Sequence, residues 1–283
     1  MSNLDSMQRF TFDNTDVRGE LVGLNKSLNS ALSKHEYPEA IKIELGKLMA
    51  ASALMSATLK YEGRLCLQVR LSGDVTLIQA ETTNTGEIRA IARYDESKQQ
   101  DIKEVELQGG QLVITLEPAV GKPYQGVVPL DSNHLNEAFE YYFKQSEQLG
   151  SRFWLVCNGI TASGFMLQQL PASAESDEDA WDRLSHLAST LKEDELRDLD
   201  NQTILYRLFH EEQVRIYEET PLQFACTCSK ERTGNAIAQL GFDELMDIIA
   251  EQGKISVDCQ FCLQHYSFNK AQVAELFPEK KLH

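Results

Sequence analysis

The sequence predicts an α+β protein with an N-terminal domain of mixed sheet and helix, a helical acidic linker and a small cysteine-rich C-terminal domain. Strand-like runs separated by Gly-containing turns are flanked by helical patterns over the first 170 residues, without the regular alternation of a doubly wound sheet. Acidic residues concentrate in the segment 171–220, and four of the six cysteines follow residue 225. These three observations define the three predicted regions.

The uneven charge places the domain boundaries. The whole chain has a net charge of −16, of which the 14 acidic and 5 basic residues of 171–220 contribute −9. Because the composition changes on both sides of this segment, we expect domains over 1–172 and 221–283, joined by a linker over 173–220. A hydrophobic content of 42% is sufficient for a packed core.

Charge and hydropathy also exclude several classes of protein. The acidic balance argues against binding to nucleic acids and to anionic membranes, since both require basic surface. The longest apolar stretch, residues 48–59, is too short to span a bilayer. The N-terminal residues contain no apolar run of signal-peptide length. We therefore expect a cytoplasmic protein.

The N-terminal domain combines both periodicities. Apolar residues at helical spacing predict a helix over 41–59, and a second helix is expected over 133–148 with Gly150 as its stop signal. Cys66 and Cys157 fall inside apolar strand-like runs and are interpreted as core thiols. Strands are expected over 65–71, 75–80, 88–92, 105–107, 111–116, 152–156 and 165–170.

The acidic linker predicts two short amphipathic helices, the second beginning after Asp200. Isolated helices of about a dozen residues are marginal in water, so their stability must come from docking. Two interpretations remain open: an ordinary solvated connector, or a segment that docks or melts with the state of its neighbour. The apolar stripes consist of Trp181, Leu184, Leu187, Ala188 and Leu191 in the first helix and of Ile204, Leu205, Leu208 and Phe209 in the second.

Common catalytic motifs are absent. The sequence contains no G-x-G-x-x-G, no Walker A and no G-x-S-x-G motif. His210 and Glu211 begin an H-E-x-x-H pattern, but Val214 occupies its last position. We therefore expect a protein that is not an enzyme.

The C-terminal cysteines form a C-x-C pair, Cys226 and Cys228, and a C-x-x-C pair, Cys259 and Cys262. Four thiolates at this spacing are typical of a closed tetrahedral zinc site, which predicts one Zn²⁺ per chain. The second pair lies in a strand–turn–strand pattern over 255–268, and a helix over 243–252 separates the two pairs. His265 is interpreted as a strand side chain, because four cysteines already complete the site.

Such a site has two possible roles. A structural zinc ion supplies the folding free energy of a small domain. The same dependence permits redox sensing, since oxidants attack thiolates and oxidation removes the ligands. The spacing permits a disulfide within each pair, and a C-x-C bridge requires a local bend that makes it strained and reducible.

Several segments carry a resemblance to a known family. In the C-terminal half they are ILYRLFHEEQVRIYEETPLQFACTCS (residues 204–229), KERTGNAIAQLG and VDCQFCLQHYSF. Upstream they are LMAASALMSATLKYEGRL, GKPYQGVVPL, YYFKQSEQLGSRFWL and GFMLQQLP. Through these segments the chain resembles the bacterial 33-kDa heat-shock protein family over nearly its whole length. It departs from the family in VRLSGDVTLIQAE and GEIRAIAR, which lack expected glycines.

The resemblance implies a redox-regulated holdase chaperone of the oxidative and heat stress response. In the family, the reduced, zinc-bound state is inactive and its C-terminal module supports the linker. Oxidation to the disulfides Cys226–Cys228 and Cys259–Cys262 releases zinc, the module and linker unfold, and the protein dimerises. It then holds unfolding client proteins without ATP. Dimerisation and client binding are assigned to the N-terminal domain. The linker residues implied in the switch are Trp181, Leu184, Leu187, Leu191, Leu205, Leu208 and Phe209.

Two other functions were weighed against this one. A thiol–disulfide oxidoreductase could use Cys259 and Cys262, but the surrounding pattern is not thioredoxin-like and the other cysteine pair would be unexplained. A zinc ribbon could bind RNA or a ribosomal partner, but the C-terminal region has a net charge of −2.

Overall fold

The chain divides into two structural units, residues 1–225 and 226–283. The computed structural model describes residues 5–59, 62–171, 177 and 179–277, so the predicted boundary at residues 172 and 173 lies outside the described residues. Helices and antiparallel sheets occur in both units, which confirms the predicted α+β class. Among the described residues, no helix has the length and apolar character needed to traverse a bilayer.

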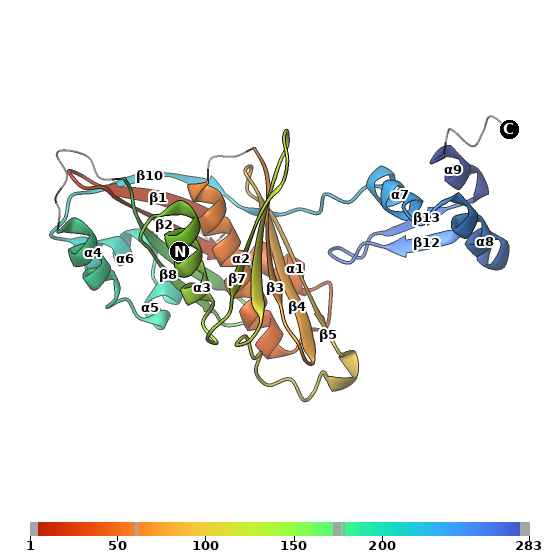
Figure 1. Cartoon of the computed structure of the whole chain (residues 1–283). Coiled ribbons are helices and arrows are strands. Elements are labelled where there is room, and N and C mark those ends of the chain that lie inside the picture. Colours follow the sequence, from red (N-terminus) through yellow and green to blue (C-terminus); the bar gives the residue numbers. More distant parts are fainter. Residues whose placement is uncertain (1–4, 60–61, 172–176, 178, 278–283) are drawn as a thin grey trace. The chain divides into compact units, whose positions relative to one another are not determined.

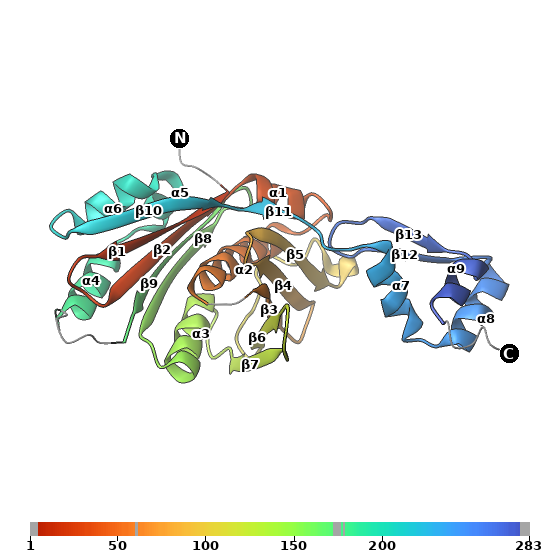
Figure 2. The same ribbon diagram turned by 90° about the horizontal axis from the view of Figure 1, so that it is seen from above.

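The first unit contains a five-stranded antiparallel sheet, here called sheet A, in the order β10-β1-β2-β9-β8 (Figures 1 and 2). Neighbouring side chains along each strand point to opposite faces, so Met7 and Val22 face one hydrophobic cluster while Phe10 and Leu21 face another. Its strands are β1 (Ser6–Phe12), β2 (Val17–Leu24), β8 (Ser151–Cys157), β9 (Ala162–Gln169) and β10 (Val214–Pro221).

A six-stranded sheet B follows the order β11-β5-β4-β3-β6-β7, with only the β11–β5 pairing parallel. Its strands are β3 (Gly63–Arg70), β4 (Val75–Thr83), β5 (Glu87–Tyr94), β6 (Gln111–Pro118), β7 (Tyr124–Pro129) and β11 (Gln223–Phe224). Helix α1 (Lys26–Leu32) packs near β5 and β11, and a 3-10 turn (Glu96–Lys98) follows β5.

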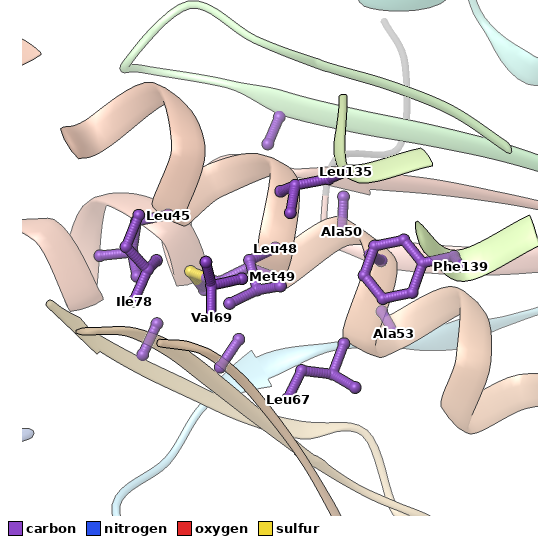
Figure 3. Packing of buried hydrophobic residues seen from close by; sticks show 14 of the residues in the cluster. Leu45, Leu48, Met49, Ala50, Ala53, Leu67, Val69, Ile78, Leu135 and Phe139 are labelled. Carbon is purple, nitrogen blue, oxygen red and sulfur yellow. The ribbon is translucent and has the colours of Figure 1, made fainter. Parts of the chain in front are cut away.

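The long helix α2 (Glu39–Thr58), which confirms the helix predicted over 41–59, packs against both sheets. Its buried residues share one cluster with the inner faces of sheets A and B. Figure 3 shows Leu48 and Met49 of this helix close to Val69 of β3, with Phe139 of α3 (Leu135–Tyr142) nearby. This cluster is the main core of the unit.

One prediction for the N-terminal region is wrong. Residues 105–107 do not form a strand, and the Asn133 side chain accepts hydrogen bonds from the backbone of Leu107 and Gln108 at 2.8 and 2.9 Å. The helix predicted over 133–148 is confirmed: α3 continues into a π-helix (Phe143–Glu147) that ends at Gln148, whose φ of 56° reverses the chain before Gly150.

The acidic segment forms helices α4 (Ala180–Ala188), α5 (Glu193–Asp198) and α6 (Asn201–Phe209), which pack on the outer face of sheet A. The sequence predicted two helices in this segment and the structure has three, since α4 ends at Ala188, before Leu191 of the predicted stripe. The last residues assigned to the helical linker are extended: Val214 and the residues that follow pair with β1 as strand β10. The β-branched and aromatic residues Val214, Ile216 and Tyr217 favour this extended conformation.

The second unit is small. It contains α7 (Lys230–Ala238), α8 (Phe242–Gln252), β12 (Ile255–Asp258), β13 (His265–Phe268) and α9 (Lys270–Glu275). The antiparallel β12–β13 pair confirms the strand–turn–strand predicted over 255–268, and α8 confirms the helix predicted over 243–252. Its buried hydrophobic core consists of Ile237, Leu245, Ile249, Ile255, Phe268 and Val273.

Candidate metal centre

The four C-terminal cysteines meet in one cluster. The sulfur atoms of Cys226, Cys228, Cys259 and Cys262 all lie within 4.8 Å of one another. Two contacts join the two pairs, with 3.6 Å from the Cys226 sulfur to the Cys259 sulfur and 3.4 Å from the Cys228 sulfur to the Cys262 sulfur. All four side chains are half-buried. Sequence spacing therefore identified residues that the fold brings together.

The first pair is held by the start of helix α7. Ser229 caps this helix, because its hydroxyl oxygen accepts a hydrogen bond from the backbone N–H of Arg232 at 3.1 Å. The guanidinium of Arg232 in turn donates to the carbonyl of Thr227, between the two cysteines, at 2.9 Å. The first turn of α7 thus fixes the loop that carries Cys226 and Cys228.

The second pair lies in the tight turn between β12 and β13. The N–H of Cys259 donates to the carbonyl of Gln264 at 3.0 Å, and the N–H of Leu263 donates back to the carbonyl of Cys259 at 2.8 Å. Leu263 adopts a left-handed conformation with φ of 59°, which is uncommon for a bulky residue. This turn brings the sulfur atoms of Cys259 and Cys262 to one cluster.

The donor set fits a metal ion. When four sulfurs coordinate an ion tetrahedrally with metal–sulfur bonds of about 2.3 Å, the sulfurs are about 3.8 Å from one another. The four sulfurs of this cluster, which all lie within 4.8 Å of one another, are close to that arrangement. Burial, together with the neighbouring thiols, raises the pKa of Cys262 to about 12, and burial also raises the pKa of Cys259. A bound cation would favour the thiolate form of Cys259 and Cys262 and offset the effect of burial.

One contact at the site was not predicted from the sequence. The hydroxyl of Tyr266, on β13, donates a hydrogen bond to the sulfur of Cys228 at 3.1 Å. No spacing rule indicates this contact, since it depends on how β13 lies beside the C-x-C loop. His265 lies outside the cysteine cluster, and its Nδ1 is 2.7 Å from a carboxylate oxygen of Asp258.

The remaining cysteines belong to the first unit. Cys66 on β3 is buried and Cys157 on β8 is half-buried. Burial raises the pKa of Cys66 to about 12 and that of Cys157 to about 11. Both therefore remain thiols at neutral pH and are poor nucleophiles.

The linker residues singled out in the sequence gather on the outer face of sheet A. Leu184, Leu205, Leu208 and Phe209 are buried there, and Trp181, Leu187 and Leu191 are partly buried against the same cluster. The ring of Phe209 packs edge-on against Phe12 of β1, with centroids 4.9 Å apart. The helices therefore cover an aromatic and aliphatic sheet face that their removal would expose.

Comparison with known proteins agrees with this arrangement. A family model described as Hsp33 protein matches residues 5–269. A protein named 33 kDa chaperonin from Pseudomonas syringae pv. syringae is 47% identical over 286 residues, covering 97% of this chain and 94% of the relative. Another, from Pseudomonas aeruginosa strain LESB58, is 47% identical over 284 residues, covering 98% and 96%.

A solved structure shares the fold. The crystal structure of a 33 kDa chaperonin (heat shock protein 33 homolog) from Thermotoga maritima aligns with a TM-score of 0.81 at 24% identity. The alignment covers 98% of this chain and 99% of that chain.

Proposed function

The chain belongs to the Hsp33 family, and we propose from this premise that it is a redox-regulated, ATP-independent holdase chaperone. One observation carries the proposal. A four-cysteine cluster lies in a unit with a small hydrophobic core, directly after a chain segment whose helices cover the apolar face of sheet A. A change at the cysteines can thereby control access to that face.

In the reduced state, Cys226, Cys228, Cys259 and Cys262 would together hold one Zn²⁺. Zinc suits a closed site of four thiolates because it has no redox chemistry of its own. When bound, it would keep the four sulfurs ionised and supply about 10–16 kcal/mol toward folding of the C-terminal unit. Tyr266 would orient the Cys228 sulfur through its hydroxyl.

Activation would begin with oxidation of the cysteine sulfurs by a peroxide. One thiolate attacks the peroxide to give a sulfenic acid and hydroxide, and a second thiolate attacks that sulfur to give a disulfide and a second hydroxide. We expect the bonds Cys226–Cys228 and Cys259–Cys262. Partners within a pair are two or three residues apart in the chain, so they can meet before and after the unit unfolds, whereas the contacts at 3.4 and 3.6 Å between pairs require the folded unit.

Sulfurs held in disulfides no longer offer the thiolates that bind the ion, so the C-terminal unit would unfold. The docking of the linker helices on sheet A is only marginally favourable, so it would be lost at elevated temperature. Each large apolar side chain that it buries contributes about 1.5–3 kcal/mol, while ordering each residue costs about 1–2 kcal/mol in backbone entropy. The 14 acidic residues of 171–220 add self-repulsion in the docked state.

Release of α4–α6 would uncover the outer face of sheet A, where Phe10, Leu21 and Phe165 are fully buried beneath the helices. An exposed apolar face of this kind binds unfolding proteins and favours self-association. We therefore propose client binding by the N-terminal unit and a homodimer in the oxidised state. The partners are proteins, not nucleic acids or membranes, and we expect the protein to act in the cytoplasm as a non-enzymatic component of the stress response.

The test measures zinc content and suppression of citrate synthase aggregation on the same samples, before and after peroxide treatment at elevated temperature. The proposal predicts one zinc per chain and no suppression before treatment, and zinc loss with suppression afterwards. Samples re-reduced with thiol and zinc serve as the reversal control. Suppression that is equal in zinc-loaded reduced and in oxidised samples would contradict redox control.

A further inference from the structure

Residues 214–224 cover the β1 edge of sheet A and pair with the first two residues of β5 at one edge of sheet B. Strand β10 pairs with β1 at the edge of sheet A, and β11 continues the chain beside β5 at the edge of sheet B (Figure 2). Four further backbone hydrogen bonds hold the segment and its ends. At the sheet A side, the N–H of Asp13 donates to the carbonyl of Gln213 (3.0 Å), and the N–H of Leu222 donates to the carbonyl of Asp5 (2.8 Å). At the sheet B side, the N–H of Gln223 donates to the carbonyl of Gly86 (2.9 Å), and the N–H of Ala225 donates to the carbonyl of Ile88 (3.1 Å).

Strand β10 is held at the β1 edge mainly through its backbone. Four consecutive β10 side chains, from Arg215 to Glu218, are exposed, including Ile216 and Tyr217. Val214 is the β10 residue that packs against the apolar cluster beneath the linker helices. An edge that recognises backbone groups accepts many sequences, as a chaperone requires.

The buried side chain of Gln8 provides a further hydrogen bond to the backbone of a strand at this edge. Gln8 of β1 is 8% exposed, and its amide nitrogen donates to the carbonyl of Tyr217 at 3.0 Å. This bond lies where the β1–β10 register shifts between Gln8 and Phe10. The amide oxygen of Gln8 accepts from Asn201, the first residue of α6, at 3.0 Å. Gln8 thus loses both partners if α6 and β10 leave together.

The edge also adjoins the apolar face. Ile216 and Val214 stand opposite Phe10 and Phe12 in the ladder, so alternate residues of any strand at this position lie on the side of the sheet that α4–α6 cover. A strand with apolar residues at alternate positions would gain backbone hydrogen bonds and apolar contacts at once.

We propose that the edges of β1 and β5, vacated by residues 214–224, bind extended segments of unfolded client proteins by strand addition. The proposal rests on the proposed function, because the edges open only when the linker is released. Residues 214–224 remain tethered and compete at an effective concentration of about millimolar. At the β1 edge, a client segment with several apolar side chains outcompetes β10, which contributes little beyond its backbone and Val214. Leu222 and Phe224 pack in the main core and hold the β5 end of the segment more firmly, so the β1 edge opens first. Covering both edges in the reduced state also protects them from unwanted pairing.

Hydrogen exchange on the full chain tests the proposal, with reduced, carboxymethylated α-lactalbumin as a permanently unfolded client. We expect exchange in residues 5–13 to accelerate at least about tenfold on oxidation and to slow again by a similar factor when client is added. On β5 the same change is expected only at Glu87 and Ile88, the residues that pair with β11. Residues 17–24 of β2 serve as the internal reference, since they lie within sheet A.

The outcomes separate this inference from its premise. If the client binds while residues 5–13 keep exchanging fast, strand addition is wrong and the proposed function stands. If oxidation leaves residues 5–13 protected, release of residues 214–224 is wrong and the inference is overturned with it. If protection returns without client and rises with protein concentration, a second copy occupies the edge, which also overturns the client assignment.

A peptide competition provides the matched control. A synthetic peptide of residues 212–224 should compete with the client for the oxidised chain and weaken client binding by at least about threefold at millimolar peptide. The same peptide with Arg215→Pro and Thr220→Pro should not compete. These residues stand at the hydrogen-bonded positions of the β1–β10 ladder, in phase with the Asp13–Gln213 and Leu222–Asp5 bonds, and proline cannot donate the ladder hydrogen bond there. Equal competition by both peptides would overturn recognition through the backbone.

Discussion

The two units of the chain bury apolar surface on different scales. The first packs α2 against the inner faces of two sheets, with a cluster that reaches from Met7 to Leu222. Among its described residues, the second has a cluster of six buried hydrophobic residues around α8 and the β12–β13 pair. Domains of this size are marginal without disulfides or metal. We therefore expect the first unit to be stable through its core and the second to depend on its cysteine cluster, the difference on which the proposed switch relies.

Replacing a cluster cysteine should produce the largest effect. Cys262→Ser removes one of the four sulfurs, so we expect loss of stoichiometric zinc and unfolding of the C-terminal unit, which forfeits most of the roughly 10–16 kcal/mol supplied by the metal. Zinc content and hydrogen exchange of α7–α9 provide the measurement. The matched control is Cys66→Ala, a cysteine of the first unit that should keep one zinc. A full equivalent of zinc in Cys262→Ser would refute the assignment.

The next effect concerns the linker. Leu208→Asp places a charge on the buried face of α6 and should cost about 3–5 kcal/mol, enough to undock the helix. We expect this variant to suppress citrate synthase aggregation partly while still reduced and zinc-loaded. Tyr206→Asp is the control, because Tyr206 lies on the same helix but is 72% exposed. If α6 opens in Leu208→Asp and the reduced protein stays inactive, linker release is not the switch.

A smaller effect is expected at the hydroxyl that contacts the cluster. Tyr266→Phe removes the hydrogen bond to the Cys228 sulfur and should weaken zinc affinity by about 10–100-fold, as is usual for partners of metal ligands. Chelator competition measures the affinity. His265→Gln is the control, since His265 contacts Asp258 instead. Unchanged affinity in Tyr266→Phe would show that the contact is incidental to metal binding.

The smallest change removes the cap of α7. Ser229→Ala should destabilise the C-terminal unit by about 1 kcal/mol and lower the temperature at which peroxide activates the protein. Ser229→Asn preserves a capping side chain and should behave like the wild type. Activation temperatures that do not differ between the two variants would mean that the first turn of α7 does not limit opening of the site.

The sequence was sufficient for the features that depend on local pattern. Cysteine spacing located the four-cysteine cluster, and helical periodicity located α2 and the apolar stripes of α4 and α6. Strand β10 was missed because residues 210–220 continue an acidic, helix-like composition, and their pairing with β1 is set by contacts more than 190 residues away in the chain. The contact between Tyr266 and Cys228 is likewise tertiary, since it joins residues 38 positions apart.

The central claim is that chemistry at the cysteines controls the docking of α4–α6 on sheet A. The most direct measurement follows three signals in one time course with peroxide at elevated temperature: zinc release, hydrogen exchange of residues 180–209 and capture of a client. The account predicts that zinc release comes first and that client capture rises together with exchange in residues 180–209. Client capture while these helices remain protected would contradict it.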